Sequence, residues 1–403
     1  MERPTIPTVD NIYYTDKCTE LEKCIEMNST LQEMKIEYDR DNEITSTIIS
    51  VIRGVTRNKT ITSLTIHVDT PPPPPLPDGV IEQLLKDNNT LQALSLDISY
   101  ELQPSSLNIV EVNTPLTPLV IGGRRGSKLM TSSLIPHIKG LYCLILYDPY
   151  PPHLLFVSHP SLHTLTLTLD TAKSAIELFT ILQTNTTLKA LSVEIKEERV
   201  YTSSMGTSLQ DMLTQNQTLK YLEINNSIPS SFLSFLTTGL KHNTSLQQLS
   251  VSIPLNEEIR TFINVISQKN NLTEFEVIFK PDQSYSNYSE KEKEQIMTPL
   301  FYEQALPAVT NMLQSHTTIR LLRIECEDIN KESSQPNWIE LVQHLYETIF
   351  IHPSLEYIEI NTGLFAPHLL VDTLKDQKKT LIDRHRKKQP HKPLPIVNLA
   401  AIA

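Results

Sequence analysis

The stretch Asn185-Thr-Thr-Leu-Lys-Ala-Leu-Ser-Val-Glu-Ile195 decides the fold, because the same pattern returns in degenerate form along the whole chain. Leu188 is followed by apolar residues three, five and seven positions later. The alternation at the end of this series is typical of a β-strand with one buried face. The stretch is therefore one unit of a repeat, and each unit is expected to contribute one strand.

Twelve segments of the chain carry this unit. Each has an apolar anchor residue, apolar residues three and five positions after it, and another apolar residue six positions before it. In the clearer units the upstream apolar residues are spaced three or four apart, which indicates one face of a helix. Each unit is thus predicted to form a helix, a turn and a strand. The anchors are Leu31, Ile61, Leu91, Leu116, Leu141, Leu162, Leu188, Leu219, Leu246, Leu272, Ile319 and Leu355.

The turn between helix and strand has a residue preference of its own. Three positions before the anchor, seven units carry Asn and three carry His, the non-glycine residues that best tolerate the left-handed backbone conformation. We therefore expect that conformation at Asn28, Asn58, Asn88, Asn113, Asn185, Asn216, Asn243, His159, His316 and His352. Six of these asparagines begin Asn-x-Ser/Thr sequons, as a glycosylated ectodomain would show, but the turn position explains them without sugar.

This pattern resembles the leucine-rich repeat family, and within it the cytosolic, ribonuclease-inhibitor-like subfamily that NOD-like receptors also carry. The resemblance covers roughly Leu21 to Gly363. It implies an α/β leucine-rich repeat solenoid (horseshoe) of about twelve repeats, with a parallel β-sheet on the concave side and helices on the convex side. The family usually places a laddering Asn nine residues into the motif. Here that place holds Asp39, Asp69, Asp170 or mixed residues, so we expect the longer apolar strand to replace the ladder.

The repeat also sets the expected domain organisation. We predict an N-terminal extension at 1–20, the solenoid at 21–363, a C-terminal capping helix at 364–382, and a basic, Pro-containing, disordered tail at 383–403. Loops are expected at 70–79 and 280–298. Many prolines lie between Pro104 and Pro152, where we expect extended or short 3₁₀ segments in place of helices.

Composition favours a cytoplasmic protein. The chain has 403 residues, of which 39% are hydrophobic and 20% charged, and no apolar run approaches the roughly 20 residues that span a bilayer. The N-terminus lacks the apolar stretch of a signal peptide. The four cysteines are scattered and are expected to be reduced thiols. A net charge of −11 argues against nucleic acid and for a basic partner, and we expect a monomer that binds no membrane.

No motif in the sequence predicts chemistry. The run Gly122-Gly-Arg-Arg-Gly-Ser-Lys128 departs from the phosphate-loop spacing and is interpreted as a basic loop. His153, His159 and His163 lie close in sequence but lack a neighbouring acidic or Cys ligand. We find none of the nucleophile and base combinations of known hydrolases. The sequence therefore predicts a protein that is not an enzyme and needs neither a cofactor nor a metal.

The concave face is predicted to carry the binding site. Residues two, four and six positions after each anchor should project from this face, and nine acidic residues against two basic ones stand there. Acidic side chains with interspersed Tyr suit a basic protein partner, although a solvated strand face that keeps the solenoid soluble would explain the same acids. The predicted partner-binding residues are Glu194, Tyr221, Glu223, Glu274, Glu276, Glu325, Tyr357 and Glu359.

Three functions fit these features. The first is a non-catalytic scaffold for protein–protein interaction that binds a partner on the acidic concave face. The second, implied by the family resemblance, is the ligand-sensing part or a relative of a NOD-like innate immune receptor. The third is an adaptor that docks profilin or EVH1 domains through a polyproline run, which otherwise serves as a rigid spacer. That run is Pro71, Pro72, Pro73, Pro74 and Pro75.

Overall fold

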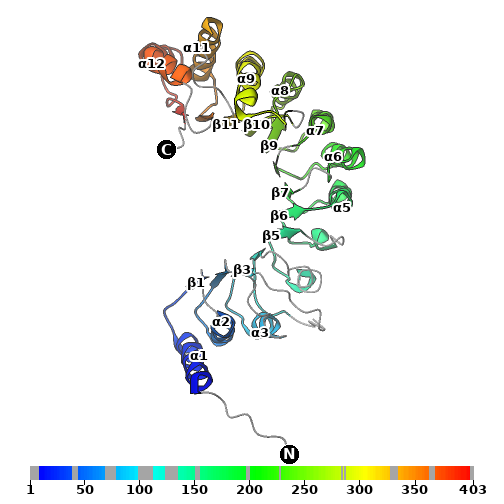
Figure 1. Ribbon diagram of the computed structural model, residues 1–403, viewed down its shortest axis with the longest axis vertical. Helices are drawn as coiled ribbons and strands as arrows, with labels where there is room; N and C mark the ends of the chain where they lie inside the picture. The colour runs from blue at the N-terminus through cyan, green and yellow to red at the C-terminus, as the bar shows by residue number, and fades with distance from the viewer. Residues whose placement is uncertain are drawn as a thin grey trace, which may run out of the picture. The chain divides into compact units, whose positions relative to one another are not determined.

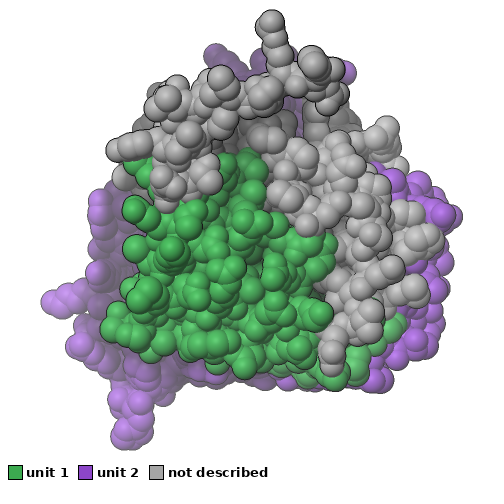
Figure 2. Space-filling view, turned by 90° about the horizontal axis from the view of Figure 1, so that it is seen from below, with its two compact units in different colours: residues 1–168 green, residues 169–403 purple. Residues whose placement is uncertain are grey.

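The computed structural model shows an α/β repeat fold in which parallel strands alternate with helices (Figure 1). The thirteen strands in the described part of the chain follow one another in sequence order. The chain divides into two compact units, residues 1–168 and 169–403 (Figure 2). The described residues are 9–38, 44–68, 79–98, 112–122, 135–149, 155–196, 200–226, 228–282, 285, 287–326, 335–362 and 368–399.

The first unit, unit 1, alternates strands with helices at its start and with 3₁₀ turns at its end. Its elements are α1 (Val9–Met27), β1 (Glu33–Tyr38), α2 (Ile44–Arg57), β2 (Ser63–Val68), α3 (Val80–Asp87), β3 (Ala93–Ile98), β4 (Pro118–Gly122), η1 (Ile135–His137), β5 (Cys143–Pro149), η2 (Leu155–Ser158) and β6 (Thr164–Leu169). The two 3₁₀ segments, η1 and η2, confirm the short turns predicted for the proline-rich region.

The second unit, unit 2, has a helix between each pair of neighbouring strands. Its first elements are α5 (Ala172–Thr184), β7 (Ala190–Ile195), α6 (Ser203–Gln215), β8 (Tyr221–Asn225), α7 (Ser230–His242), β9 (Gln248–Pro254), α8 (Ile259–Ser267) and β10 (Glu274–Lys280). Its last elements are α9 (Glu290–Leu300), the π-helix η5 (Phe301–Ala305), α10 (Leu306–Ser315), β11 (Leu321–Cys326), α11 (Pro336–Ile351), β12 (Tyr357–Asn361), α12 (His368–Lys388) and β13 (Ile396–Asn398).

The twelve predicted strands are confirmed, because β1 to β12 each begin two residues after an anchor. Side chains alternate along them as expected: in β8, Leu222 and Ile224 are buried, whereas Tyr221 and Glu223 are half-buried. Within unit 2 the helices α5 to α8 lie on one side of β7 to β10 (Figure 1). We call the other side of the strands, which carries Tyr221 and Glu223, the open face. The fold is of the leucine-rich repeat type.

The turns before the strands correct the prediction of a left-handed backbone. Asn216 has φ −74° and ψ 116°, and His316 has φ −87° and ψ 124°, which are extended conformations. Among the described non-glycine residues only Asn226 has a positive φ. The residue preference at the turn must therefore come from the side chain and not from the backbone.

The side chain of Asn216 shows what the turn requires. Its Oδ1 accepts hydrogen bonds from the backbone N–H groups of Thr218 and Leu219, at 2.9 Å and 2.8 Å. Its Nδ2 donates to the carbonyl oxygens of Leu182 and Asn185 in the preceding unit, at 2.6 Å and 3.1 Å. The two donated bonds satisfy carbonyl groups at the end of the preceding helix, and the two accepted bonds satisfy N–H groups of the turn itself. Asn58, Asn88 and Asn243 make the same contacts.

An asparagine ladder is therefore present at the turns before β2, β3, β8 and β9, and not at the place where the family usually has it. Histidine continues it in the later units. The Nδ1 atom of His352 accepts from the N–H of Leu355 at 2.9 Å, and its Nε2 lies 2.6 Å from the carbonyl oxygen of His316. The imidazole thus fills both roles of the amide, as acceptor and donor. The expectation that a longer strand replaces the ladder was wrong.

Two segments are more ordered than predicted. The expected loop at 280–298 contains most of α9, which begins with a capping box formed by Ser289 and Glu292. The expected disordered tail continues α12 to Lys388 and then forms β13, which pairs with β12. His385 explains this order, because it is 1% exposed and its Nδ1 lies 2.6 Å from the carbonyl oxygen of Phe350 on α11.

The polyproline run Pro71–Pro75 and the loop at 70–79 lie outside the described residues, apart from Gly79. In the part of the chain that the structure describes, no helix is both long and apolar enough to cross a membrane. None of the four cysteines, all of which the structure describes, is in a disulfide.

Candidate functional site

The open face of unit 2 consists of three rows of side chains, which we number two, four and six by their distance from the anchors. The parallel register aligns each row across neighbouring strands. Row two holds Ala190, Tyr221, Gln248, Glu274, Leu321 and Tyr357; row four holds Ser192, Glu223, Ser250, Glu276, Arg323 and Glu359. Six of the eight predicted site residues therefore lie in two adjacent rows. The other two, Glu194 and Glu325, lie in row six.

Around Glu359 the open face neutralises its own acidic charge. The Nε of Arg323 lies 3.2 Å from Glu359 Oε2, and its Nη1 lies 3.7 Å from Glu276 Oε2. The hydroxyl of Tyr357 donates to Glu359 Oε2 at 3.1 Å, and Asn398 Nδ2 donates to Glu359 Oε1 at 2.9 Å. Arg323 is one of the two basic residues that the sequence pattern placed on this face. In the structure it pairs with two of the predicted binding residues, Glu276 and Glu359.

Around Glu223 the acidic charge is concentrated. Tyr221 donates to Glu223 Oε2 at 2.9 Å. Burial, and then the negative charges of Glu223, Glu276 and Glu274, raise the pKa of the Tyr221 hydroxyl above its ordinary value. All three carboxylates are thus close enough to act on one phenol, and the phenol stays protonated as a hydrogen-bond donor. The surface from β8 to β10 is the acidic centre of the open face.

Two residues that the sequence did not predict form the floor of this centre. Ser250 and Ser252 of β9 are on the open face by strand alternation, yet they are only 8% and 4% exposed. Larger side chains on β8 and β10 stand on both sides of them. Short polar residues carry no signal of their own in a sequence, so only the register shows that they lie between two acidic strands.

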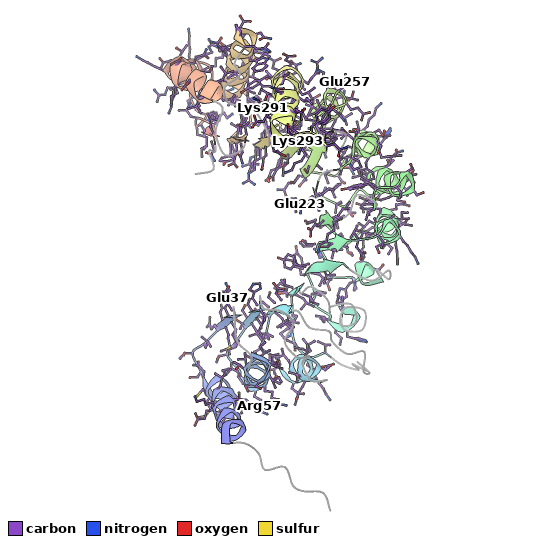
Figure 3. The ribbon with its side chains drawn as sticks, viewed as in Figure 1. Glu37, Arg57, Glu223, Glu257, Lys291 and Lys293 are labelled. Atoms are coloured by element: carbon purple, nitrogen blue, oxygen red, sulfur yellow. The ribbon has the colours of Figure 1, made fainter. Side chains whose placement is uncertain are left out.

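The open face of unit 1 has a different character, because its acids have partners nearby. Lys35 Nζ lies 2.5 Å from Glu37 Oε1, and its hydrogen bond and charge lower the pKa of Glu37 (Figure 3). His67 Nδ1 lies 2.7 Å from Asp97 Oδ2. These two ion pairs distinguish the open face of unit 1 from the surface around Glu223 in unit 2.

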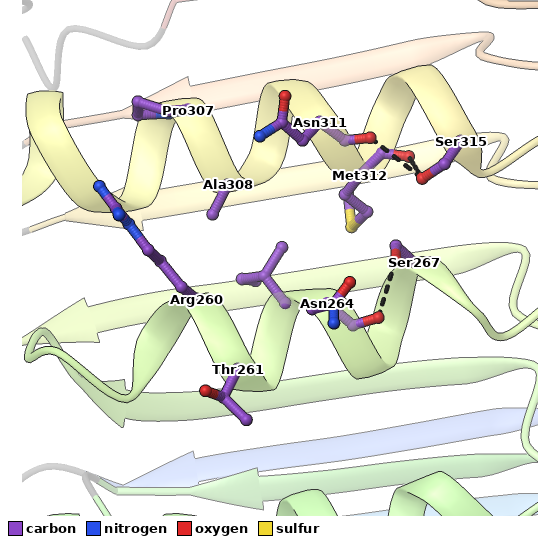
Figure 4. A pocket seen from close by; sticks show the side chains of 10 residues that line it. Arg260, Thr261, Asn264, Ser267, Pro307, Ala308, Asn311, Met312 and Ser315 are labelled. Carbon is purple, nitrogen blue, oxygen red and sulfur yellow. Dashed lines mark hydrogen bonds between the residues drawn. The ribbon is translucent and has the colours of Figure 1, made fainter.

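A groove of about 600 Å³ lies between α8 and α10, on the helix side of unit 2 (Figure 4). At one end, Arg260 Nη2 donates to the carbonyl oxygen of Glu303 at 2.9 Å. Arg260 is the only charged residue among those that line the groove, and the others are short polar or apolar side chains. The groove could not be predicted from the sequence. It depends on how closely α8 and α10 pack, although α9 and η5 come between them in the chain.

The three histidines considered for metal binding do not form a cluster in the described structure. His159 is buried in its turn, where its Nδ1 lies 3.4 Å from the backbone nitrogen of Ser161. The ring of His163 stacks on Tyr142 with 4.5 Å between centroids, and His153 lies outside the described residues. In the described part of the chain, no group of three or more His, Cys, Asp or Glu residues could hold a metal ion. Of the run 122–128, only Gly122 is described.

Comparisons with known proteins add little to this picture. No protein-family model matches the sequence, and no curated protein matches it. Among solved structures, the chain is similar to one described as "Leiomodin-1 Actin-Binding Site 2 (ABS2)", with 14% identity and a TM-score of 0.27. The match covers 54% of this chain and 97% of that chain. A likeness at this level carries no conclusion about function, which has to be argued from the site.

Proposed function

We propose that this protein is a non-catalytic scaffold that binds a partner protein with a basic surface through the open face of unit 2. The observation that carries the proposal is the ordered set of Tyr and Glu side chains in rows two and four. Hydrogen bonds fix two pairs of these side chains before any partner arrives, Tyr221 with Glu223 and Tyr357 with Glu359. Preorganised side chains lose less conformational entropy on binding, so more of the contact energy appears as affinity.

The residue types suit a protein partner. Tyrosine offers a large, rigid contact surface, and aromatic residues often dominate the binding energy of interfaces. Carboxylates accelerate encounter with a basic surface and discriminate against acidic ones. Tyr221 and Glu223 are half-buried, so they combine restricted motion with access from the open side.

The test is a charge reversal on the open face. A partner is first isolated by affinity capture and purified, and its dissociation constant is then measured with wild-type protein and with Glu223→Lys/Glu276→Lys. We expect at least about tenfold weaker binding, or about 1.4 kcal/mol, because like charges would then face each other. Circular dichroism checks that the fold is intact.

The matched control is Glu257→Lys/Glu340→Lys, which changes the net charge equally at exposed positions of unit 2. Glu257 lies in the turn before α8 and Glu340 on α11, and Figure 3 shows Glu257 beside the helices and Glu223 on the strand side. The control should keep wild-type affinity. Equal affinity of the open-face variant and the wild type would refute the proposal.

Further parts of the proposal rest on the sequence. We infer a cytoplasmic monomer of the ribonuclease-inhibitor-like subfamily that binds neither nucleic acid nor membrane, supported by composition and by the helices between the strands of unit 2. An innate immune sensor and a profilin or EVH1 adaptor remain predictions. The adaptor function depends on Pro71–Pro75, outside the described residues, and no contact in the structure favours either alternative over the scaffold.

A further inference from the structure

Two strands of unit 2 carry nearly the same sequence. β8 reads Tyr221-Leu-Glu-Ile-Asn225 and β12 reads Tyr357-Ile-Glu-Ile-Asn361. In both strands the tyrosine and the glutamate lie on the open face, and the tyrosine hydroxyl donates to Oε2 of the glutamate, at 2.9 Å and 3.1 Å. The open face thus presents the same tyrosine–carboxylate pair twice.

In β12 this pair holds a guanidinium group from the chain itself. Arg323 of β11 lies in register between Glu359 of β12 and Glu276 of β10. Its nitrogens lie 3.2 Å and 3.7 Å from the two carboxylates. The two glutamates are separated by two strand spacings, or roughly 9.6 Å between their Cα atoms. That separation suits one guanidinium between two carboxylates.

Between β8 and β10 the same arrangement has serine in place of arginine. Ser250 of β9 lies in register with Glu223 on one side and Glu276 on the other. The two glutamates are again two strand spacings apart. The row-four neighbour on the far side of β8 is Ser192, so neither β7 nor β9 places a basic residue beside Glu223 in this row. On its other side, Glu276 has Arg323, whose Nη1 approaches Glu276 Oε2.

Ser252 provides independent evidence that a ligand binds between Glu223 and Glu276. Its side chain is 4% exposed, and its hydroxyl makes no hydrogen bond with any residue that the structure describes. Strand alternation puts it on the open face, next to Ser250 along β9. A buried hydroxyl without a partner is unfavourable, and an N–H group of a ligand would satisfy it.

We propose that the partner inserts an arginine side chain between Glu223 and Glu276, above Ser250, where its guanidinium takes a place equivalent to that of Arg323 between Glu276 and Glu359. This inference rests on the proposed scaffold function and specifies the side chain that the open face recognises. Arginine is favoured over lysine because its planar fork of five N–H donors can bond two carboxylates and a hydroxyl at once. An ammonium acts as a single point charge.

The first experiment uses two synthetic peptides, Gly-Ser-Gly-Arg-Gly-Ser-Gly and the same sequence with Lys in place of Arg, added to the full-length protein. Backbone amide signals are followed by TROSY NMR. We expect the arginine peptide to shift the signals of Tyr221, Ser250 and Ser252, and the lysine peptide to bind about tenfold more weakly, a difference of about 1.4 kcal/mol. Equal binding of both peptides, or shifts confined to other regions, would overturn the proposal.

The second experiment fills the site from within the chain. Ser250→Arg should place a guanidinium between Glu223 and Glu276 and abolish binding of the arginine peptide. The matched control is Ser95→Arg, in row four of β3 in unit 1, where the two neighbours in the row are Thr65 and Val120 and neither is a carboxylate. The control should bind the peptide as the wild type does. Undiminished binding by a folded Ser250→Arg protein would contradict the proposal.

A third variant keeps the test independent of how well Ser250→Arg folds. Glu223→Gln preserves shape and removes one charge, so it should weaken binding of the arginine peptide about tenfold, while Glu257→Gln should have no effect.

The purified partner then separates the two proposals. If Glu223→Lys/Glu276→Lys weakens its binding and Ser250→Arg does not, the scaffold function stands and the arginine site fails. If neither variant weakens it, the scaffold function fails as well.

Discussion

At the scale of single residues, the turn Asn is a structural device with a clear chemical definition. Its side chain must accept hydrogen bonds from two N–H groups in its own unit and donate hydrogen bonds to carbonyl oxygens in the preceding unit, as that of Asn216 does. Glutamine would place the amide one methylene too far, and Asp would lose the donor. A neutral imidazole can do both, which explains why His replaces Asn at His316 and His352.

This use of His predicts acid sensitivity. Burial lowers the pKa of His352 to about 4, and the charges of Lys392 and His316 act in the same direction. In the unfolded chain His352 is protonated near the ordinary histidine pKa of about 6.5, whereas in the folded chain it is protonated only at lower pH. Stability is therefore complete above about pH 6.5 and is lost as the pH falls towards 4. The loss from this residue is up to about 3 kcal/mol.

The measurement is urea unfolding between pH 7 and pH 4, with His352→Asn as the comparison. Asn keeps the acceptor and donor of the ladder but does not titrate, so the variant should lose less stability than the wild type over this range. Two parallel pH profiles would show that His352 does not contribute.

At the scale of elements, two helices of unit 2 pack closely where one of them carries a glycine. A Cβ atom at Gly206 of α6 would lie 2.4 Å from the ring of Phe235 on α7. We expect Gly206→Ala to lower the free energy of unfolding by about 1–3 kcal/mol, because either the ring or the helix must shift. Alanine has the higher helix propensity by about 1 kcal/mol, so a loss would show that packing outweighs propensity.

Thermal unfolding with Gly140→Ala as control would check this prediction. At Gly140 the nearest atom to a new Cβ is the Leu116 carbonyl oxygen, 3.6 Å away, which is an ordinary contact. The control should change the midpoint little. A higher midpoint for Gly206→Ala than for the wild type would show that α6 and α7 can separate without loss.

The strands show how far sequence reasoning reaches at this scale. The start of each of the first twelve strands follows from its anchor, because alternation is a local property of five or six residues. β13 was missed, since Ile396–Asn398 is three residues long and its first residue is 63% exposed. Alternation also placed the eight predicted binding residues on one face of the strands, the open face. Their partners could not be predicted, because Arg323 and Glu359 come from different units.

At the scale of the whole molecule, a repeat protein needs covered ends, because the last unit otherwise exposes its apolar side. The C-terminal residues provide this cover for unit 2. Gln389 Nε2 donates to the carbonyl oxygen of Ile351 at 2.8 Å, and Lys392 Nζ donates to that of His352 at 2.6 Å. These are the carbonyl groups at the end of α11, where a following unit would otherwise supply the donors.

Removing this cover should destabilise unit 2. A chain that ends at Asp383 loses His385, Gln389, Lys392 and β13, so we expect a lower unfolding midpoint and increased aggregation, followed by light scattering. A chain that ends at Leu399 keeps all these contacts and serves as the control. Identical midpoints for the two truncated proteins would mean that the segment after Asp383 contributes nothing, as for a disordered tail.

The sequence by itself determined the repeat, the strand positions and the side of each strand that faces the core, because these follow from spacings within one unit, whose anchor lies 21 to 47 residues from the next. Only the tertiary structure decided the asparagine ladder and the order of the C-terminal segment. It also decided that Glu359 pairs with Arg323, whereas Glu223 lies beside Ser250. Each of these joins atoms from different units. Such contacts are set by the register between strands, which a local pattern does not contain.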